Sequence, residues 1–104
     1  MNTIYTPYFP IHPGEMLKDE LSARGIKQKQ FAEVIGVSYS LLNEVLNCKR
    51  PISADLALAV EAALGIKAYI WVNQQAEYNL QIASRDQKTI DRQERIRSIC
   101  ASLL

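Results

Sequence analysis

The run GVSYSLLNEVLNCKRP, which covers residues 36–51, separates its side chains onto two opposite faces of a helix. At about 100° per residue, its polar and aromatic side chains fall within an arc of about 140°. These are Tyr39, Ser40, Asn43, Glu44 and Asn47. The opposite face carries Leu41, Leu42, Val45 and Leu46. A face that is only solvated usually carries Lys and Glu, whereas amides, a hydroxyl and a phenol form directional hydrogen bonds. The polar face therefore predicts a binding surface.

A tight turn is predicted immediately before this helix. Gly36 tolerates the positive φ that such a turn often requires, and the small side chain of Ala32 lets the next helix cross closely. The angle between the two helices is expected to be filled by Phe31, Ile35, Val37, Leu42 and Val45. This is the packing of a helix-turn-helix unit, whose second helix is held outward so that its first residues can enter the DNA major groove.

Apolar spacing predicts two helices on the N-terminal side of that turn. The first starts at Pro13, because proline suits the first helical position, and stops near Arg24 and Gly25. The second spans about residues 27–35 and ends at Gly36. Its apolar set is Phe31, Ala32, Val34 and Ile35. Residues 1–12 show no periodicity and are expected to form an extended arm.

Three further helices are predicted on the C-terminal side of the polar-faced helix. Ser38 is expected to cap the polar-faced helix and Ser53 the next one, which ends at Gly65. A helix over about residues 67–83 places Trp71, Gln75, Tyr78 and Ile82 on one face. Residues 84–104 read as an amphipathic tail helix. No segment alternates as a strand does, so we predict an all-α fold.

Composition limits the class of protein but does not identify a ligand. A chain of 104 residues is long enough for one domain, and a net charge of +1 neither requires nor excludes nucleic acid. No apolar run approaches the roughly 20 residues that span a bilayer, so a cytoplasmic protein is expected. Cys48 and Cys100 lie far apart beside a single histidine, which predicts free thiols rather than a metal site or disulfide. The sequence shows neither a nucleophile–base pairing nor a glycine-rich phosphate loop, so we expect neither an enzyme nor a bound cofactor.

The segment IKQKQFAEVIGVSYSLLNEVLNCKRPISADLALAVEAALGI resembles the XRE, phage-repressor-like helix-turn-helix domain. The wider pattern from HPGE to WVNQQAEYNLQIA resembles the HigA branch of antitoxins. This resemblance implies a repressor-like domain of five helices over residues 13–83, followed by the tail helix. It also implies a DNA-binding antitoxin that represses its own operon and neutralises a RelE-like ribonuclease toxin. A stand-alone repressor and a pure protein-interaction scaffold are the alternatives.

The resemblance assigns roles to two groups of residues. The base-reading positions are Tyr39, Ser40, Asn43 and Glu44. The phosphate-contacting positions are Lys27, Gln28, Ser38, Asn47, Lys49 and Arg50, with Gln28 also bracing the recognition helix. The chemistry agrees, because Asn pairs bidentately with adenine, Glu accepts from cytosine, Ser donates or accepts, and Tyr packs on the thymine methyl or reaches a phosphate.

Several of these residues have a structural alternative. Ser38 also suits an N-cap, Glu44 also suits pairing with a cation, and the lysines and Arg50 also suit ordinary solvated charges. Trp71 and Tyr78 are expected in the core, and His12 is expected to be structural. Cys48 stands where the family usually has glycine, so it either adopts a left-handed backbone at a cost of about 1 kcal/mol or changes the loop path.

The tail is predicted to contact a partner through Ile90, Ile96, Ile99 and Leu103. This pattern is compatible with three roles: a homodimer interface, a contact with a toxin, or packing back on the preceding helix. We favour a homodimer, because one short recognition helix makes few base contacts, whereas a two-fold pair reads two half-sites of a palindromic operator about 34 Å apart.

Overall fold

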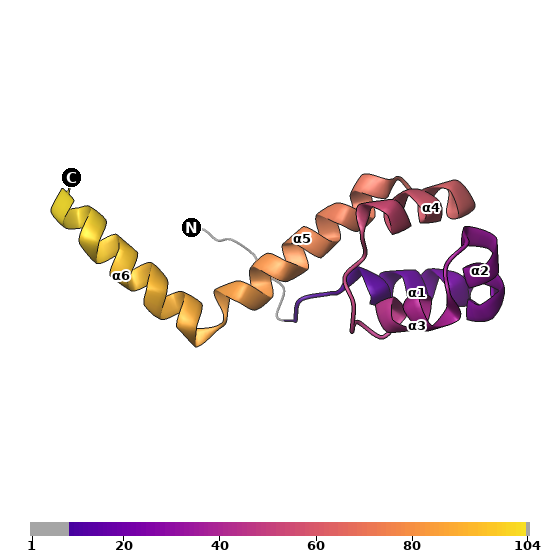
Figure 1. Ribbon diagram of the computed structural model, residues 1–104, viewed down its shortest axis with the longest axis horizontal. Helices are drawn as coiled ribbons and strands as arrows, with labels where there is room; N and C mark the ends of the chain where they lie inside the picture. The colour runs from indigo at the N-terminus through magenta and orange to yellow at the C-terminus, as the bar shows by residue number, and fades with distance from the viewer. Residues whose placement is uncertain (1–8, 104) are drawn as a thin grey trace.

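The computed structural model describes residues 9–103, and its described residues form helices without any strand (Figure 1). The helices are α1 (Pro13–Ala23), α2 (Gln28–Ile35), α3 (Tyr39–Leu46), α4 (Ala54–Leu64), α5 (Ala68–Ser84) and α6 (Gln87–Leu103). The predicted all-α fold of five helices and a tail helix is therefore confirmed. Most of the predicted N-terminal arm, residues 1–8, lies outside the described residues, as does Leu104.

The helix ends follow the local signals in the sequence. The Ser38 hydroxyl accepts a hydrogen bond from the Leu41 N–H at 3.0 Å, and the Ser53 hydroxyl accepts one from the Leu56 N–H at 3.1 Å. These bonds satisfy backbone donors that a helix N-terminus leaves without an intrahelical partner. Gly36, after α2, has a φ of 74°, which supports the predicted tight turn into α3.

The core is formed by buried side chains of α1, α2, α3 and α4, and α5 closes it with Trp71, which is 2% exposed. Most of the predicted apolar positions are buried here. Tyr78, which was expected in the core, is only half-buried. Two members of the predicted apolar sets lie on the surface, namely Val34, which is 70% exposed, and Ile82, which is 47% exposed. Val34 points away because α2 packs on α3 and α4 through Phe31 and Ala32, so only one edge of its apolar set is covered.

The start of α1 is pressed against the backbone of α3. A Cβ atom added at Gly14 would overlap the carbonyl oxygen of Val45 and lie 2.9 Å from its carbonyl carbon. His12 caps α1, because its Nδ1 accepts from the Gly14 N–H at 2.8 Å, and its ring packs edge-on against Tyr78. The structural interpretation of His12 is thus confirmed. The close approach fixes α3 against α1 at the level of Val45.

The C-terminal half extends away from this body. α5 crosses the other helices and then turns into α6, so the molecule measures 57 × 29 × 20 Å (Figure 1). Gln75 of α5 accepts from the buried Ile52 N–H at 2.8 Å and so ties the loop before α4 to α5. α6 has no buried residue. Among the described helices, none is both long and apolar enough to cross a membrane.

Candidate nucleic-acid interface

The polar face of α3 lies on the surface, as predicted. Tyr39 is 51% exposed, Ser40 and Asn47 are also exposed, and Asn43 and Glu44 are half-buried. The opposite face is in the core, with Leu42, Val45 and Leu46 at most 1% exposed and Leu41 half-buried. The side chains of this face therefore remain accessible to a ligand.

A chain of three side-chain amides runs along this surface. Asn47 Nδ2 donates to the Asn43 main-chain carbonyl at 2.9 Å and to Asn43 Oδ1 at 3.1 Å. Asn43 Nδ2 in turn donates to Gln28 Oε1 at 3.2 Å. Gln28 is the first residue of α2, so this last bond crosses between the two helices of the turn. The predicted bracing of α3 by Gln28 is thus present in the structure.

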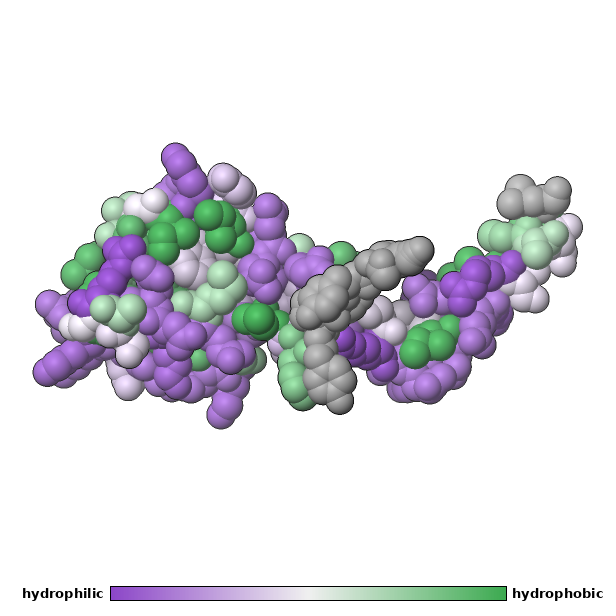
Figure 2. Space-filling model, turned by 180° about the vertical axis from the view of Figure 1, so that it is seen from behind, coloured by the Kyte–Doolittle hydropathy of each residue, from purple (hydrophilic) through white to green (hydrophobic). Residues whose placement is uncertain are grey.

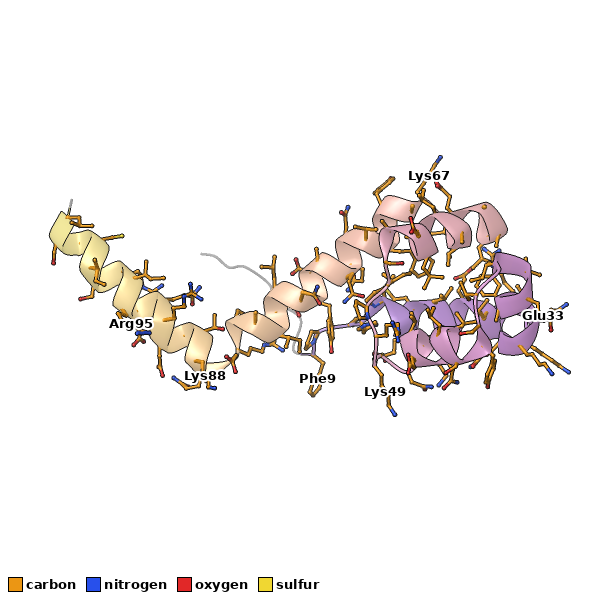
Figure 3. The ribbon with its side chains drawn as sticks, viewed as in Figure 1. Phe9, Glu33, Lys49, Lys67, Lys88 and Arg95 are labelled. Carbon is orange, nitrogen blue, oxygen red and sulfur yellow. The ribbon has the colours of Figure 1, made fainter. Side chains whose placement is uncertain are left out.

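Glu44 forms an ion pair with a cation of the following loop. Its carboxylate lies 2.8 Å from Arg50 Nε, and both side chains are substantially exposed. An exposed pair of this kind adds little to stability, at most about 1 kcal/mol. The interpretation of Glu44 as a partner for a cation is therefore confirmed. Lys49, the neighbouring cation, points away from the body below the end of α3 (Figure 3).

Cys48 adopts the left-handed backbone that glycine usually supplies at this position. Its φ is 64°, and its N–H donates to the Val45 carbonyl at 3.0 Å. The Lys49 N–H donates to the Glu44 carbonyl at 2.8 Å, so the loop still closes α3 tightly. Burial and the nearby Glu15 raise the pKa of the Cys48 thiol. This thiol is therefore protonated at neutral pH and is a poor nucleophile.

The exposed face of α3 forms one wall of a shallow groove. The other walls come from the second half of α1 and the start of α2. The groove is lined by Lys18, Ser22, Lys27, Gln28, Lys29, Tyr39, Asn43 and Asn47, among others. It thus joins three lysines to the hydrogen-bonding residues, which suits an anionic ligand with polar edges. Lys18 and Ser22 were not among the predicted site residues, because their spacing within α1 does not reveal which neighbour they face.

The predicted partner-contact residues of α6 do not share one face. Ile96, Ile99 and Leu103 are 48%, 54% and 76% exposed and lie within a narrow arc of the helix. Ile90 is half-buried and lies well outside that arc, near the corner with α5. The face of α6 seen in Figure 2 is largely hydrophilic, with separate hydrophobic patches. The apolar stripe is therefore shorter than the sequence pattern indicated.

The arrangement of α2, turn and α3 agrees with a known family. The sequence profile of the helix-turn-helix family matches residues 17–71, which is more than half of the chain. The chain belongs to the helix-turn-helix family. Within it, α2 and α3 are the paired helices, and Gly36 stands at the turn between them.

Similar proteins come from several bacteria. Virulence-associated protein I of Dichelobacter nodosus is 38% identical over 82 residues, which cover 78% of this chain and 76% of that protein. A putative antidote protein of a plasmid maintenance system from Nostoc punctiforme is 36% identical, with a TM-score of 0.73 over 85% of this chain and 94% of its own. The antitoxin HigA of Pseudomonas aeruginosa, solved with the higBA promoter, is 36% identical, with a TM-score of 0.73 over 80% of this chain and 92% of its own. The predicted resemblance of this helix-turn-helix protein to HigA antitoxins is confirmed.

Proposed function

We propose that this protein is a sequence-specific DNA-binding antitoxin that represses its own operon and neutralises a RelE-like ribonuclease toxin. The observation that carries the DNA-binding part is the accessible polar face of α3 beside the lysines of the groove. Similarity to an antitoxin solved with promoter DNA supports this part, and similarity to antidote proteins supports the antitoxin part.

In this proposal the residues of α3 read base edges. Asn43 keeps one free N–H and one free lone pair, which are the donor and acceptor that pair with adenine. Ser40 and Tyr39 contact neighbouring positions, and Glu44 accepts from cytosine when its partner Arg50 moves to a phosphate. The phosphate contacts come from Lys27, Gln28, Ser38, Asn47, Lys49 and Arg50, with Lys18 added from the groove.

Two copies of the chain are needed to read a palindromic operator. We assign the exposed stripe Ile96, Ile99 and Leu103 to partner contact, and favour a second copy over the toxin as its occupant. Association places two α3 helices on successive turns of one duplex, about 34 Å apart. The toxin then binds elsewhere on the outer helices or the arm.

DNA binding is tested with the promoter region upstream of the protein's own gene. A Ser40→Ala, Asn43→Ala double variant is expected to bind this duplex at least about tenfold more weakly, because it removes two base contacts. Asn73→Ala, which changes an exposed residue of α5, is the matched control and should bind as the wild type does. Unchanged binding by the double variant would instead favour a scaffold that interacts only with proteins.

The antitoxin part is tested by co-expression with the product of the neighbouring small open reading frame. We expect the two proteins to purify together and the growth defect caused by that product to disappear. If there is no complex and no relief of toxicity while the promoter is still bound, the antitoxin part is wrong. The protein would then be a stand-alone repressor.

A further inference from the structure

The chain of three amides has a fixed direction, because one of its ends is a main-chain carbonyl. A carbonyl oxygen only accepts hydrogen bonds, so Asn47 must turn its nitrogen toward the Asn43 carbonyl, 2.9 Å away. The same nitrogen reaches the Asn43 side chain at 3.1 Å, and the atom that it meets there must be the oxygen. The orientation of the Asn43 amide is therefore fixed by its hydrogen bond to Asn47.

The direction continues into α2. With Oδ1 of Asn43 facing Asn47, its Nδ2 faces Gln28 and donates to Oε1 at 3.2 Å. Gln28 consequently turns its Nε2 away from Asn43, and no described residue accepts from that nitrogen. The half-buried position of Asn43 restricts rotation further. One main-chain carbonyl thus determines the orientation of three side-chain amides on two helices.

We infer that Asn47 is a positioning residue that makes Asn43 an adenine reader, rather than a residue whose main role is to bind phosphate. This inference rests on the proposed DNA-binding function. An amide turned the other way would bring its nitrogen toward the adenine amino group and its oxygen toward N7, so donor would face donor and acceptor would face acceptor. Without Asn47, the Asn43–Gln28 bond can form in either direction, because both amides carry a donor and an acceptor. Thymine, which presents the O4 acceptor to the turned nitrogen and a methyl group beside it, would then be tolerated at that position.

The first experiment is selection of bound duplexes from a randomised library, with affinities measured for single-base variants of the selected site. For the wild type we expect one position per half-site with a strong adenine preference, which Asn43→Ala abolishes. Asn47→Ala should reduce that preference by about fivefold or more, since one bidentate pair discriminates by about that factor at least. Its preferences at other positions should be unchanged, because loss of the Asn47 phosphate contact would lower the affinity for every sequence alike.

Gln28→Glu is the complementary variant. A glutamate still accepts from Asn43 Nδ2, so the adenine preference should remain, but it cannot donate to a phosphate and should weaken binding to every sequence. Asn73→Ala again serves as the control. The inference is overturned if Asn47→Ala weakens all sequences equally, as loss of a phosphate contact would, or if it leaves the adenine preference intact.

The second experiment needs no DNA. The side-chain amide of Asn43 in the free protein should give one pair of protected proton resonances by NMR. Asn47→Ala should shift these resonances and increase their exchange with solvent, while the Asn73 amide stays the same and the circular dichroism spectrum shows an intact fold. Unchanged Asn43 resonances would overturn the positioning role. A wild type that selects no sequence would overturn the proposed function, and the NMR result would still decide the orientation of Asn43.

Discussion

Replacing Gly14 by alanine should destabilise the protein through one backbone collision. The added Cβ would overlap the Val45 carbonyl oxygen and lie 2.9 Å from the carbonyl carbon, whereas ordinary contacts begin at 3.4 Å. The obstructing atoms belong to the α3 backbone, so α1 and α3 must separate. Overpacking of this kind costs about 1–3 kcal/mol, and we expect the upper end because no flexible side chain can yield. Alanine returns at most about 1 kcal/mol through its helix propensity. The net loss is about 2 kcal/mol.

This loss is measured as the free energy of unfolding in urea, followed by circular dichroism, and as a fall in Tm of about 10 °C. Gly25→Ala is the matched control, because a Cβ there meets nothing within 4 Å and only the φ of 68° opposes it. That control should lose only about 1 kcal/mol. The reasoning is refuted if Gly14→Ala is as stable as the wild type, or no less stable than Gly25→Ala.

Three further predictions concern the electrostatics and the backbone of the site. Arg50→Ala should weaken binding to specific and random duplexes alike and lower the slope of log affinity against log salt by about one, measured by fluorescence anisotropy. Lys67→Ala is the control, because Lys67 lies on the side of the molecule opposite Lys49 and points away from it (Figure 3). A loss of affinity for Arg50→Ala that is confined to one sequence would contradict the assignment of Arg50 to phosphate. Cys48→Val should lose about 1–2 kcal/mol of stability in urea, because a β-branched residue tolerates the left-handed backbone poorly, whereas Cys48→Asn should lose little. Burial lowers the pKa of His12 despite the opposing charge of Glu15, so the unfolded chain takes up the proton first. The free energy of unfolding should therefore be highest above the ordinary histidine pKa of 6.5 and should fall as the pH drops through the folded-state pKa. In urea unfolding measured across this pH range, His12→Asn should show a smaller fall of that free energy than the wild type.

Much of the fold follows from signals that act within a few residues. The Ser38 and Ser53 caps and the turn at Gly36 were predictable, because each involves only a side chain or φ angle and its near neighbours in sequence. The two faces of α3 were predictable for the same reason, since helical periodicity alone separates them.

Features that depend on how the helices pack were not predictable from the sequence. The close approach of Gly14 to the Val45 backbone involves residues 31 positions apart, and no local pattern in either segment indicates it. Lys18 reaches the groove only because α1 lies beside α3. The exposure of Val34 has the same origin, since apolar spacing shows which residues share a side of a helix but not how wide a strip its neighbours cover.

The distance of α6 from α3 along the molecule allows two ligands to be held at once (Figure 1). α6 meets α5 at the corner between them and then diverges from it, so a protein that binds only the stripe leaves the groove open to a duplex. Thermodynamic linkage requires each ligand to change the affinity of the other by the same factor. For a partner that covers only the stripe and makes no DNA contact of its own, this factor should stay near one, so that DNA and this partner bind independently. A partner that also covers α1 acts instead as a direct competitor of DNA.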